Sequence, residues 1–334
     1  MTASVRSKLL LPAGALPALL ASAAPAFAGS GGFAPVSPQS PNAEGISRSY
    51  WFVTIFVVAV FVLVESLLLA FIVRFRRRRR SRDADGAQIH GSTRLETMWT
   101  IGPVLILVAI AVFVLAKLPG IRDVPAATAG SPNLVVKVTG RQYYWQYEYP
   151  NGVIAIDELR APQGTTVELE VTAPVFDVIH SWWIPALGGK IDAIPGRVNR
   201  TWFAAERTGV FRGQCAELCG LNHARMLAAV EVLPKAEFET WLTTRKDAQD
   251  AGTSPLGREL YVGGCAKCHG LAGEGKVAAN APALKGSRIV TDAKAIDVLL
   301  RKGQNLMPAI GRDWSDAQMR AMTGYLKERF AGGN

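Results

Sequence analysis

Two long apolar runs set the pattern of the first third of the chain. Residues 51–73 and 99–118 are almost continuously hydrophobic, and each run is long enough to cross a hydrocarbon core about 30 Å thick. The arginine-rich stretch 74–82 follows the first run, which places that end on the cytoplasmic side of a membrane. This pattern predicts a transmembrane hairpin over residues 46–119.

The residues before the hairpin have the pattern of an export signal. A basic start precedes a short apolar stretch, and Ala26 and Ala28 form a small-residue cleavage site. The alternative is a short membrane helix, but prolines interrupt the stretch. We expect residues 1–28 to be a cleaved signal peptide and residues 29–45, rich in Gly, Ser and Pro, to be a flexible lead-in. Both termini of the mature chain then lie on the periplasmic face of a bacterial cell membrane.

The pattern next changes to strands and ends in helices. Within residues 120–235, short β-rich segments are separated by Gly and Pro, and no helical pattern long enough for a βαβ unit intervenes. This favours an antiparallel β-barrel or sandwich. Residues 236–253 are polar and predict a linker. Residues 254–334 predict an all-α domain that ends in an amphipathic helix over residues 316–330.

Composition and charge support this organisation. Hydrophobic residues make up 49% of the chain and charged residues only 19%, which is too apolar for an ordinary soluble enzyme. The net charge of +10 is a balance that can indicate a nucleic-acid partner. Arginines are concentrated beside the first apolar run, however, and no nucleic-acid motif is visible. We therefore expect a multi-domain membrane protein that binds no nucleic acid.

Soft metal ligands are concentrated in one short segment of the β-rich region. Cys215, Cys219, His223 and Met226 lie within it, and His180 follows a strand-like stretch upstream. Sulfur combined with imidazole favours copper, and a weak Met ligand is typical of electron-transfer copper. A helical stripe, a disulfide between the two cysteines and a zinc site are the alternatives that spacing alone leaves open.

A second chemical motif lies in the helical domain. Cys265, Cys268 and His269 form the C-x-x-C-H sequence of covalent haem attachment, in which the histidine is an axial ligand of the iron. A downstream methionine is the expected second axial ligand, and Met307 precedes a proline in the loop before the last helix. A thioredoxin-like dithiol is the alternative, but it requires a βαβ pattern that this region lacks.

These motifs together resemble a known family. The spacing C-x-E-x-C-x-x-x-H-x-x-M resembles the dinuclear copper loop of cytochrome c oxidase subunit II, and every position matches here. The resemblance extends from about residue 45 to 240, and the C-terminal domain resembles class I cytochrome c. It implies a cupredoxin-like copper domain and a caa-type subunit with a fused cytochrome. Four further segments resemble that family in the right order: residues 96–100, 140–145, 177–181 and 192–197.

The resemblance also implies a role for each ligand. Cys215 and Cys219 would bridge two copper ions, and His180 and His223 would each bind one of them. Met226 and the backbone carbonyl of Glu217 would be the weak ligands. In this family the Glu217 side chain reaches a magnesium ion shared with subunit I. The expected cofactors are therefore two copper ions, one covalent haem c and magnesium at the subunit I interface.

The resemblance assigns electron and proton paths as well. The aromatic run Tyr143, Tyr144 and Trp145 matches the family's electron path, except that Tyr143 replaces the tryptophan that usually accepts electrons from a soluble cytochrome. Glu96 resembles the carboxylate at the cytoplasmic mouth of a proton path shared with subunit I. Strand packing and a helix N-terminal carboxylate are the respective structural alternatives.

The resemblance implies the electron-input subunit of a terminal oxidase. Electrons would pass from an external donor to haem c, to the dinuclear copper and to subunit I, which reduces oxygen and pumps protons; subunit III is a further expected partner. The chain itself supplies no catalytic residue for oxygen reduction. A nitric oxide reductase subunit and a copper-delivery protein are the alternative functions, whereas a quinol oxidase subunit would lack the copper ligands.

Overall fold

The computed structural model describes residues 34–76, 88–127, 132–253, 255–276 and 280–331. The chain divides into two units, Met1–Ser37 and Pro38–Asn334. The expected signal peptide and most of the arginine-rich stretch lie outside the described residues.

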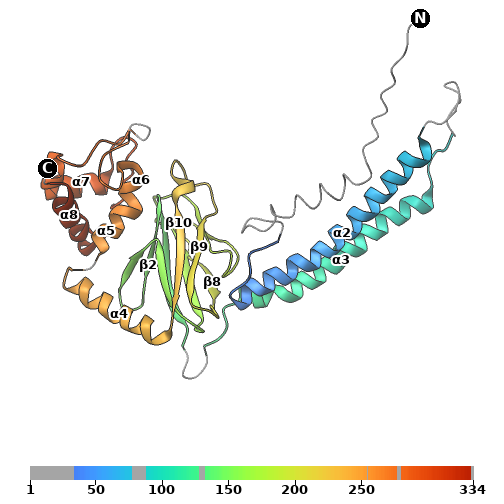
Figure 1. Cartoon of the computed structure of the whole chain (residues 1–334), viewed down its shortest axis with the longest axis horizontal. Coiled ribbons are helices and arrows are strands. Elements are labelled where there is room, and N and C mark those ends of the chain that lie inside the picture. Colours follow the sequence, from blue (N-terminus) through green and yellow to red (C-terminus); the bar gives the residue numbers. More distant parts are fainter. Residues whose placement is uncertain (1–33, 77–87, 128–131, 254, 277–279, 332–334) are drawn as a thin grey trace, which may run out of the picture. The chain divides into compact units, whose positions relative to one another are not determined.

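Two long helices form the expected hairpin. Helix α2 (Pro41–Phe75) and helix α3 (Thr93–Arg122) lie side by side and are apolar enough to cross a membrane (Figure 1). Side chains in the middle of both helices are exposed, as Leu63 and Leu107 illustrate, which suits a lipid environment. Both helices extend beyond the two apolar runs. Helix α2 begins early because Pro41 at its first position needs no backbone partner for its nitrogen.

The end of the expected flexible lead-in is fixed, which corrects the prediction for these residues. The Gln39 amide donates to the Ala186 carbonyl at 2.8 Å, and Asn42 Nδ2 donates to the Trp202 carbonyl at 2.5 Å. Asn42 and Ala43 are buried. The start of α2 therefore packs on the β domain, because its polar groups replace water with backbone partners.

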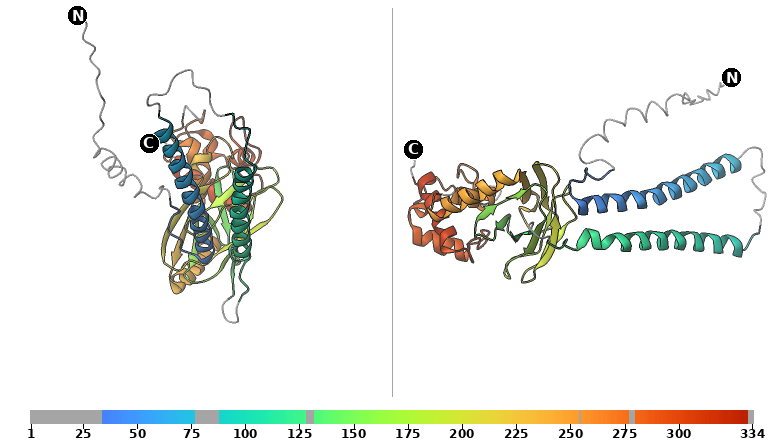
Figure 2. Two further views of the ribbon diagram at one scale, coloured as in Figure 1. Left: turned by 90° about the vertical axis from the view of Figure 1, so that its right-hand side faces the viewer. Right: turned by 90° about the horizontal axis from the view of Figure 1, so that it is seen from below.

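The β domain is a sandwich of two five-stranded sheets, with the orders β3-β2-β1-β5-β8 and β4-β10-β9-β6-β7 (Figure 2). Each sheet contains one parallel pair, β1 with β5 and β4 with β10, so the sheets are mixed rather than purely antiparallel. The strands are β1 (Leu134–Arg141), β2 (Tyr144–Glu148), β3 (Ile154–Ile156), β4 (Glu158–Pro162), β5 (Val167–Thr172), β6 (His180–Trp183), β7 (Ile191–Ala193), β8 (Asn199–Phe203), β9 (Gly209–Cys215) and β10 (Leu227–Leu233).

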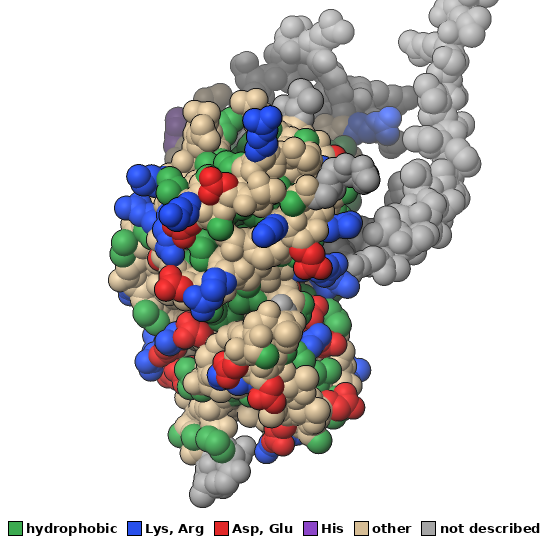
Figure 3. Space-filling model, turned by 90° about the vertical axis from the view of Figure 1, so that its left-hand side faces the viewer, with side chains coloured by type: hydrophobic (Ala, Val, Ile, Leu, Met, Phe, Trp, Pro, Cys, Tyr) green, Lys and Arg blue, Asp and Glu red, His purple; other side chains and the backbone are tan. Residues whose placement is uncertain are grey.

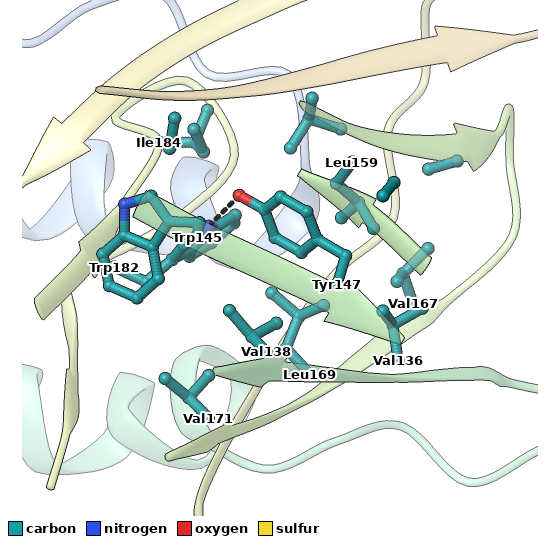
Figure 4. Packing of buried hydrophobic residues seen from close by; sticks show 14 of the residues in the cluster. Val136, Val138, Trp145, Tyr147, Leu159, Val167, Leu169, Val171, Trp182 and Ile184 are labelled. Carbon is teal, nitrogen blue, oxygen red and sulfur yellow. Dashed lines mark hydrogen bonds between the residues drawn. The ribbon is translucent and has the colours of Figure 1, made fainter. Parts of the chain in front are cut away.

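The sandwich core follows from the alternation of side chains along the strands. Val136 and Val138 of β1 and Leu169 of β5 point inward and are fully buried (Figure 4). Two large aromatic side chains join the sheets at the centre, where Trp182 Nε1 donates to the Tyr147 hydroxyl at 3.0 Å. This buried hydrogen bond satisfies both polar atoms within an otherwise apolar core.

The segment expected to be a linker is largely a packed helix. Helix α4 (Lys235–Asp250) buries Phe238. The rings of Phe238 and Trp241 contact Tyr149 of the sandwich, the first at a tilt and the second edge to face. Arg245 on the same helix is buried and donates to Glu259 of the next domain at 2.6 Å. This helix was not predicted because most of its residues are polar, and only one narrow apolar stripe packs against the sheet.

The C-terminal domain is helical, as expected. Its first and last helices cross closely at Gly257, where a Cβ atom would lie 2.1 Å from the Ala321 carbonyl oxygen. The last helix begins with a capping box between Ser315 and Gln318, which fixes its first turn. Its helices are α5 (Leu256–Leu260), a π-helical turn (Tyr261–Cys265), α6 (Ala266–His269), α7 (Ala293–Lys302) and α8 (Asp316–Phe330).

Replacing Gly257 by alanine should destabilise the helical domain by about 1–3 kcal/mol, because the added methyl group overpacks the crossing of α5 and α8. Gly324→Ala on α8 is the matched control, because nothing lies within 4 Å of its Cβ position. The control should keep or slightly raise stability through better helix propensity. Denaturant unfolding of the full chain measures both changes, and equal stabilities would contradict the close crossing.

Candidate metal centre and haem site

The five side chains predicted to bind copper come together at one end of the sandwich. His180 begins β6, Cys215 ends β9, and Cys219, His223 and Met226 lie in the connection from β9 to β10. Antiparallel pairing of β9 with β10 closes this connection, because the Cys215 amide donates to the Met226 carbonyl at 2.8 Å. Two strands and one short loop therefore position the whole set.

The ligand atoms converge on the two sulfurs. Cys215 Sγ and Cys219 Sγ lie 3.9 Å apart, and the ligand atoms of His180, Cys215 and Cys219 all lie within 4.8 Å of one another. His223 Nδ1 is 3.6 Å from Cys219 Sγ, and Met226 Sδ is 3.9 Å from the same sulfur. Both cysteines are free thiols.

Glu217 contributes through its backbone. Its carbonyl oxygen lies 3.2 Å from Cys215 Sγ, so it faces the sulfur pair. Its carboxylate points elsewhere, with Oε2 4.0 Å from Lys190 Nζ, and this side chain is 45% exposed. The geometry thus separates the two expected roles of this residue, a weak copper ligand from the carbonyl and a magnesium ligand from the side chain.

The orientation of His180 leaves one nitrogen available to a metal. The ring is fully buried, and Nε2 lies 3.3 Å from the Asp177 carboxylate. Nδ1 has no hydrogen-bond partner, which is costly for a buried polar atom unless something else occupies it. Metal-binding histidines usually donate their other nitrogen to a carboxylate in this way. An orphaned imidazole nitrogen beside two thiols fits copper well.

Asp177 was not predicted as a functional residue. It also accepts hydrogen bonds from the Val178 and Gln142 amides, so the carboxylate is fixed beside the ring. The signal that could have found it is an aspartate three residues before a ligand histidine. Gly140 is a second residue that was not predicted and that positions the His180 ring. A Cβ at Gly140 would lie about 3 Å from three atoms of the His180 side chain.

Hydrogen bonding sets the protonation of the thiols. The shared hydrogen bond between the two cysteines lowers the pKa of Cys215, with His180 adding to the effect, and it raises the pKa of Cys219. Although burial opposes a charge on His180, the neighbouring Asp177 carboxylate and Cys215 thiol raise the pKa of the ring. Because thiolates are the metal-binding form of cysteine, metal binding at this pair would be coupled to loss of a proton.

The predicted haem ligands line one cavity in the helical domain. Its volume is about 460 Å³, within the range of cofactor sites, and Cys265, Cys268, His269 and Met307 lie on its wall. His269 Nδ1 donates to the Pro282 carbonyl at 2.8 Å, which leaves Nε2 for an axial bond. Burial raises the pKa of the Cys265 thiol to about 12. A mostly apolar cavity with this donor set fits a covalent haem.

The aromatic residues 143–145, at the start of β2, contact different domains. Trp145 is buried in the sandwich and contacts the His180 ring edge to face, with ring centroids 6.0 Å apart. Tyr144 is buried among residues of the helical domain. Tyr143 lies between the two sites, because its hydroxyl accepts from the Leu221 amide at 3.2 Å and its carbonyl accepts from Lys267.

Glu96 lies apart from both sites, in the first turn of α3. The Ser92 amide donates to its carboxylate at 3.4 Å, and the side chain is exposed. This is the placement of a helix N-terminal carboxylate. Its expected role in proton uptake stays a prediction.

Three family models match successive parts of the chain. Residues 32–116 match the transmembrane domain of cytochrome c oxidase subunit II, and residues 153–233 match its periplasmic domain. Residues 254–326 match subunit III of cbb3-type cytochrome c oxidase. The order of these matches is that of the hairpin, the sandwich and the helical domain.

Relatives of known name agree with these matches. Cytochrome c oxidase subunit 2 of Alkalihalophilus pseudofirmus is 33% identical, and the match covers 87% of this chain and 89% of the relative. The subunit 2 of Cereibacter sphaeroides is 34% identical over 64% of this chain and 80% of the relative. The solved periplasmic domain of subunit II of the Bradyrhizobium japonicum oxidase is 40% identical, covering 37% of this chain and 97% of that one, with a TM-score of 0.34. The chain therefore belongs to the cytochrome c oxidase subunit II family, and it carries a c-type cytochrome domain after the copper domain.

Proposed function

We propose that this subunit receives electrons at a covalent haem c and passes them to a dinuclear copper site, from which they reach subunit I of a haem–copper oxidase. The observation that supports this most strongly is the convergence of two thiols, two imidazoles, a thioether and a carbonyl at one end of the sandwich. When bound, the copper pair as a unit and the haem iron would each accept and release one electron. Oxygen reduction and proton pumping would take place in subunit I.

Fixed positions of the ligand side chains would favour fast electron transfer. The two copper ions would be held by both thiols, both imidazoles, the thioether and one backbone carbonyl, from Cys215, Cys219, His180, His223, Met226 and Glu217. Asp177 holds the His180 ring, and β9 and β10 hold the loop at both ends. Ligands that barely move when an electron arrives keep the reorganisation energy small. Cys265 and Cys268 would attach the haem, with His269 and Met307 as axial ligands.

Further proposals concern the surroundings of the subunit. The Glu217 carboxylate would bind magnesium at the boundary with subunit I, and Glu96 would deliver protons to a path in subunit I. Subunit III and an external cytochrome or upstream complex would be the other partners. Lys and Arg side chains are interspersed with Asp and Glu on the face shown in Figure 3, so charge on that face does not single out a donor. The copper and haem domains would lie on the periplasmic side of the bacterial cell membrane.

Two cysteine substitutions should separate the two cofactors. Cys219→Ser removes one bridging thiolate, so the assembled complex should lose its dinuclear copper and keep its haem c. Cys268→Ser removes one haem thioether from a separate domain, so this complex should keep two coppers per chain. Metal analysis, EPR and the haem spectrum measure the outcome. Two coppers retained in Cys219→Ser would contradict the ligand assignment.

Asp177→Asn should weaken copper binding by about tenfold, because the ring of His180 loses the charged partner that orients it. Asp192→Asn is the control, because Asp192 accepts from the Ser181 hydroxyl and from Lys190 rather than from the ring. Copper affinity is measured on the full chain by competition with a chelator. Similar copper affinities for the two variants would show that Asp177 does not orient His180 for copper binding.

A complex without haem c should accept electrons poorly from a soluble cytochrome c. The face around Tyr143 contacts the helical domain, and a fused donor replaces the usual tryptophan route. In the variant with both Cys265 and Cys268 changed to serine, oxidation of added cytochrome c should fall by about 10²-fold or more relative to the unmodified complex. Fast turnover of the variant would show that soluble donors reach the copper directly.

A further inference from the structure

Strand β2 is buried on both faces, and its outer face is covered by the haem domain. Trp145 and Tyr147 belong to the sandwich core, whereas Tyr144, on the opposite face, belongs to the core of the helical domain together with Ile156 of β3. Tyr144 is fully buried. The haem domain therefore completes its own core with side chains of the copper domain.

Buried polar contacts fix how the two domains face each other. Trp314 Nε1 donates to the Tyr144 hydroxyl at 2.8 Å, and Gln318 Nε2 donates to Gln146 Oε1 at 3.0 Å. Both glutamines are buried. If the domains separated slightly or rotated, these groups would lose their partners inside an apolar contact, which is unfavourable.

Two ion pairs cross the same boundary. The guanidinium of Arg141, 6% exposed, pairs with both carboxylate oxygens of Asp313, with Nη2 to Oδ2 at 3.0 Å. Lys267, in the haem-binding motif, lies 3.5 Å from the Asp157 carboxylate. Breaking a buried pair leaves an uncompensated charge, so such pairs favour one docked orientation over a set of loose ones.

The haem domain approaches the strands closely at Gly263. A Cβ there would lie 2.7 Å from Ile156 Cγ2 and 3.3 Å from Tyr144 Cβ. Only glycine allows the π-helical turn before the haem motif to lie this close to β2 and β3.

The docked arrangement brings the haem motif against the copper loop. Asn222 Nδ2 donates to Cys268 Sγ at 3.2 Å, and Arg225 Nη1 donates to the Lys267 carbonyl at 3.0 Å. Asn222 is 7% exposed, and it directly precedes His223 in the chain. One hydrogen bond therefore separates a haem-attachment sulfur from the residue next to a copper ligand.

We propose that the haem domain is permanently docked on the outer face of β2 and β3, and that Asn222 is the positioning residue that couples the two redox sites. Its amide holds the sulfur of Cys268 beside the backbone of His223, so the electron crosses between the domains at this contact. This inference rests on the proposed function. It adds the docked orientation of the haem domain and the role of Asn222. Tyr143 lies on a second and longer connection, from the Lys267 side chain through its ring to the Leu221 amide.

The test of docking uses the assembled, fully oxidised oxidase. A ferric haem close to the copper centre speeds the spin relaxation of the copper EPR signal, and the effect depends on their separation. Gly263→Leu should push the domains apart and lose this enhancement. Gly324→Ala, the control in the same domain, should keep it, because its Cβ position is open.

A second variant tests docking without touching the haem motif. Asp313→Lys places a positive charge beside the buried Arg141, and the Asp313 side chain is 40% exposed, so the haem domain can still fold. This variant should also lose the enhancement. Unchanged relaxation in a variant that carries both copper and haem would overturn the docked interface.

The test of coupling compares two residues of the copper loop. Asn222→Leu removes the amide donor with little change in volume, and Leu221→Ala trims an exposed neighbour whose side chain is 72% exposed. Electron transfer from photoreduced haem c to copper should slow by about tenfold in Asn222→Leu and stay unchanged in Leu221→Ala. Copper EPR, the haem spectrum and the relaxation enhancement should be unaltered in both.

The outcomes separate this inference from the proposed function. A normal transfer rate in Asn222→Leu, with both cofactors loaded, would overturn the role of Asn222 and leave the function intact. Slower transfer in Tyr143→Phe than in Asn222→Leu would likewise overturn it in favour of the tyrosine route. Failure of the unmodified complex to pass electrons between haem c and copper would instead contradict the proposed function.

Discussion

The antiparallel pairing of β9 with β10 is the constraint on which the copper site depends. Between the two strands, the loop carries both thiols, an imidazole and a thioether, and the hydrogen bond from Cys215 to Met226 closes its ends. Strand β6 adds His180 only because β9 approaches it closely. That approach requires Gly213, where a Cβ would lie 1.9 Å from the Trp183 carbonyl oxygen. Backbone pairing therefore brings the proposed ligands together.

Strand β2 determines how the β domain and the helical domain pack together. A strand places alternate side chains on opposite faces, so one short segment can supply two separate cores. Trp145 packs beside His180 on the inner face, and Tyr144 packs beside Trp314 on the outer face. The arrangement brings the haem cavity to the copper loop through the packing of the sheet itself.

The sequence allowed the candidate ligands to be proposed because their spacing is local, and the structure places these side chains together. The spacing from Cys215 to Met226 and the haem motif at Cys265 can be read without knowing the fold. Of the contacts that support them, Asp177 lies three residues before His180, whereas Gly140 and Asn222 acquire their roles only when distant segments meet. The parallel pairing of β1 with β5 was missed for the same reason. Helix α4 was missed because its few apolar side chains are recognisable as a buried face only when they pack against Tyr149.

The packed helix α4 changes the physical reason for fusing a cytochrome to this subunit. A flexible linker would raise the effective concentration of the donor, and each electron would still wait for a productive encounter. Helix α4 is instead anchored at both ends, with Phe238 buried against the sandwich and Arg245 paired with Glu259 of the haem domain. The entropy of ordering the contact is then lost once, when the chain folds, and not again with each electron. In the proposed docked form, fusion would supply a fixed distance between the haem and copper sites, which concentration alone cannot do.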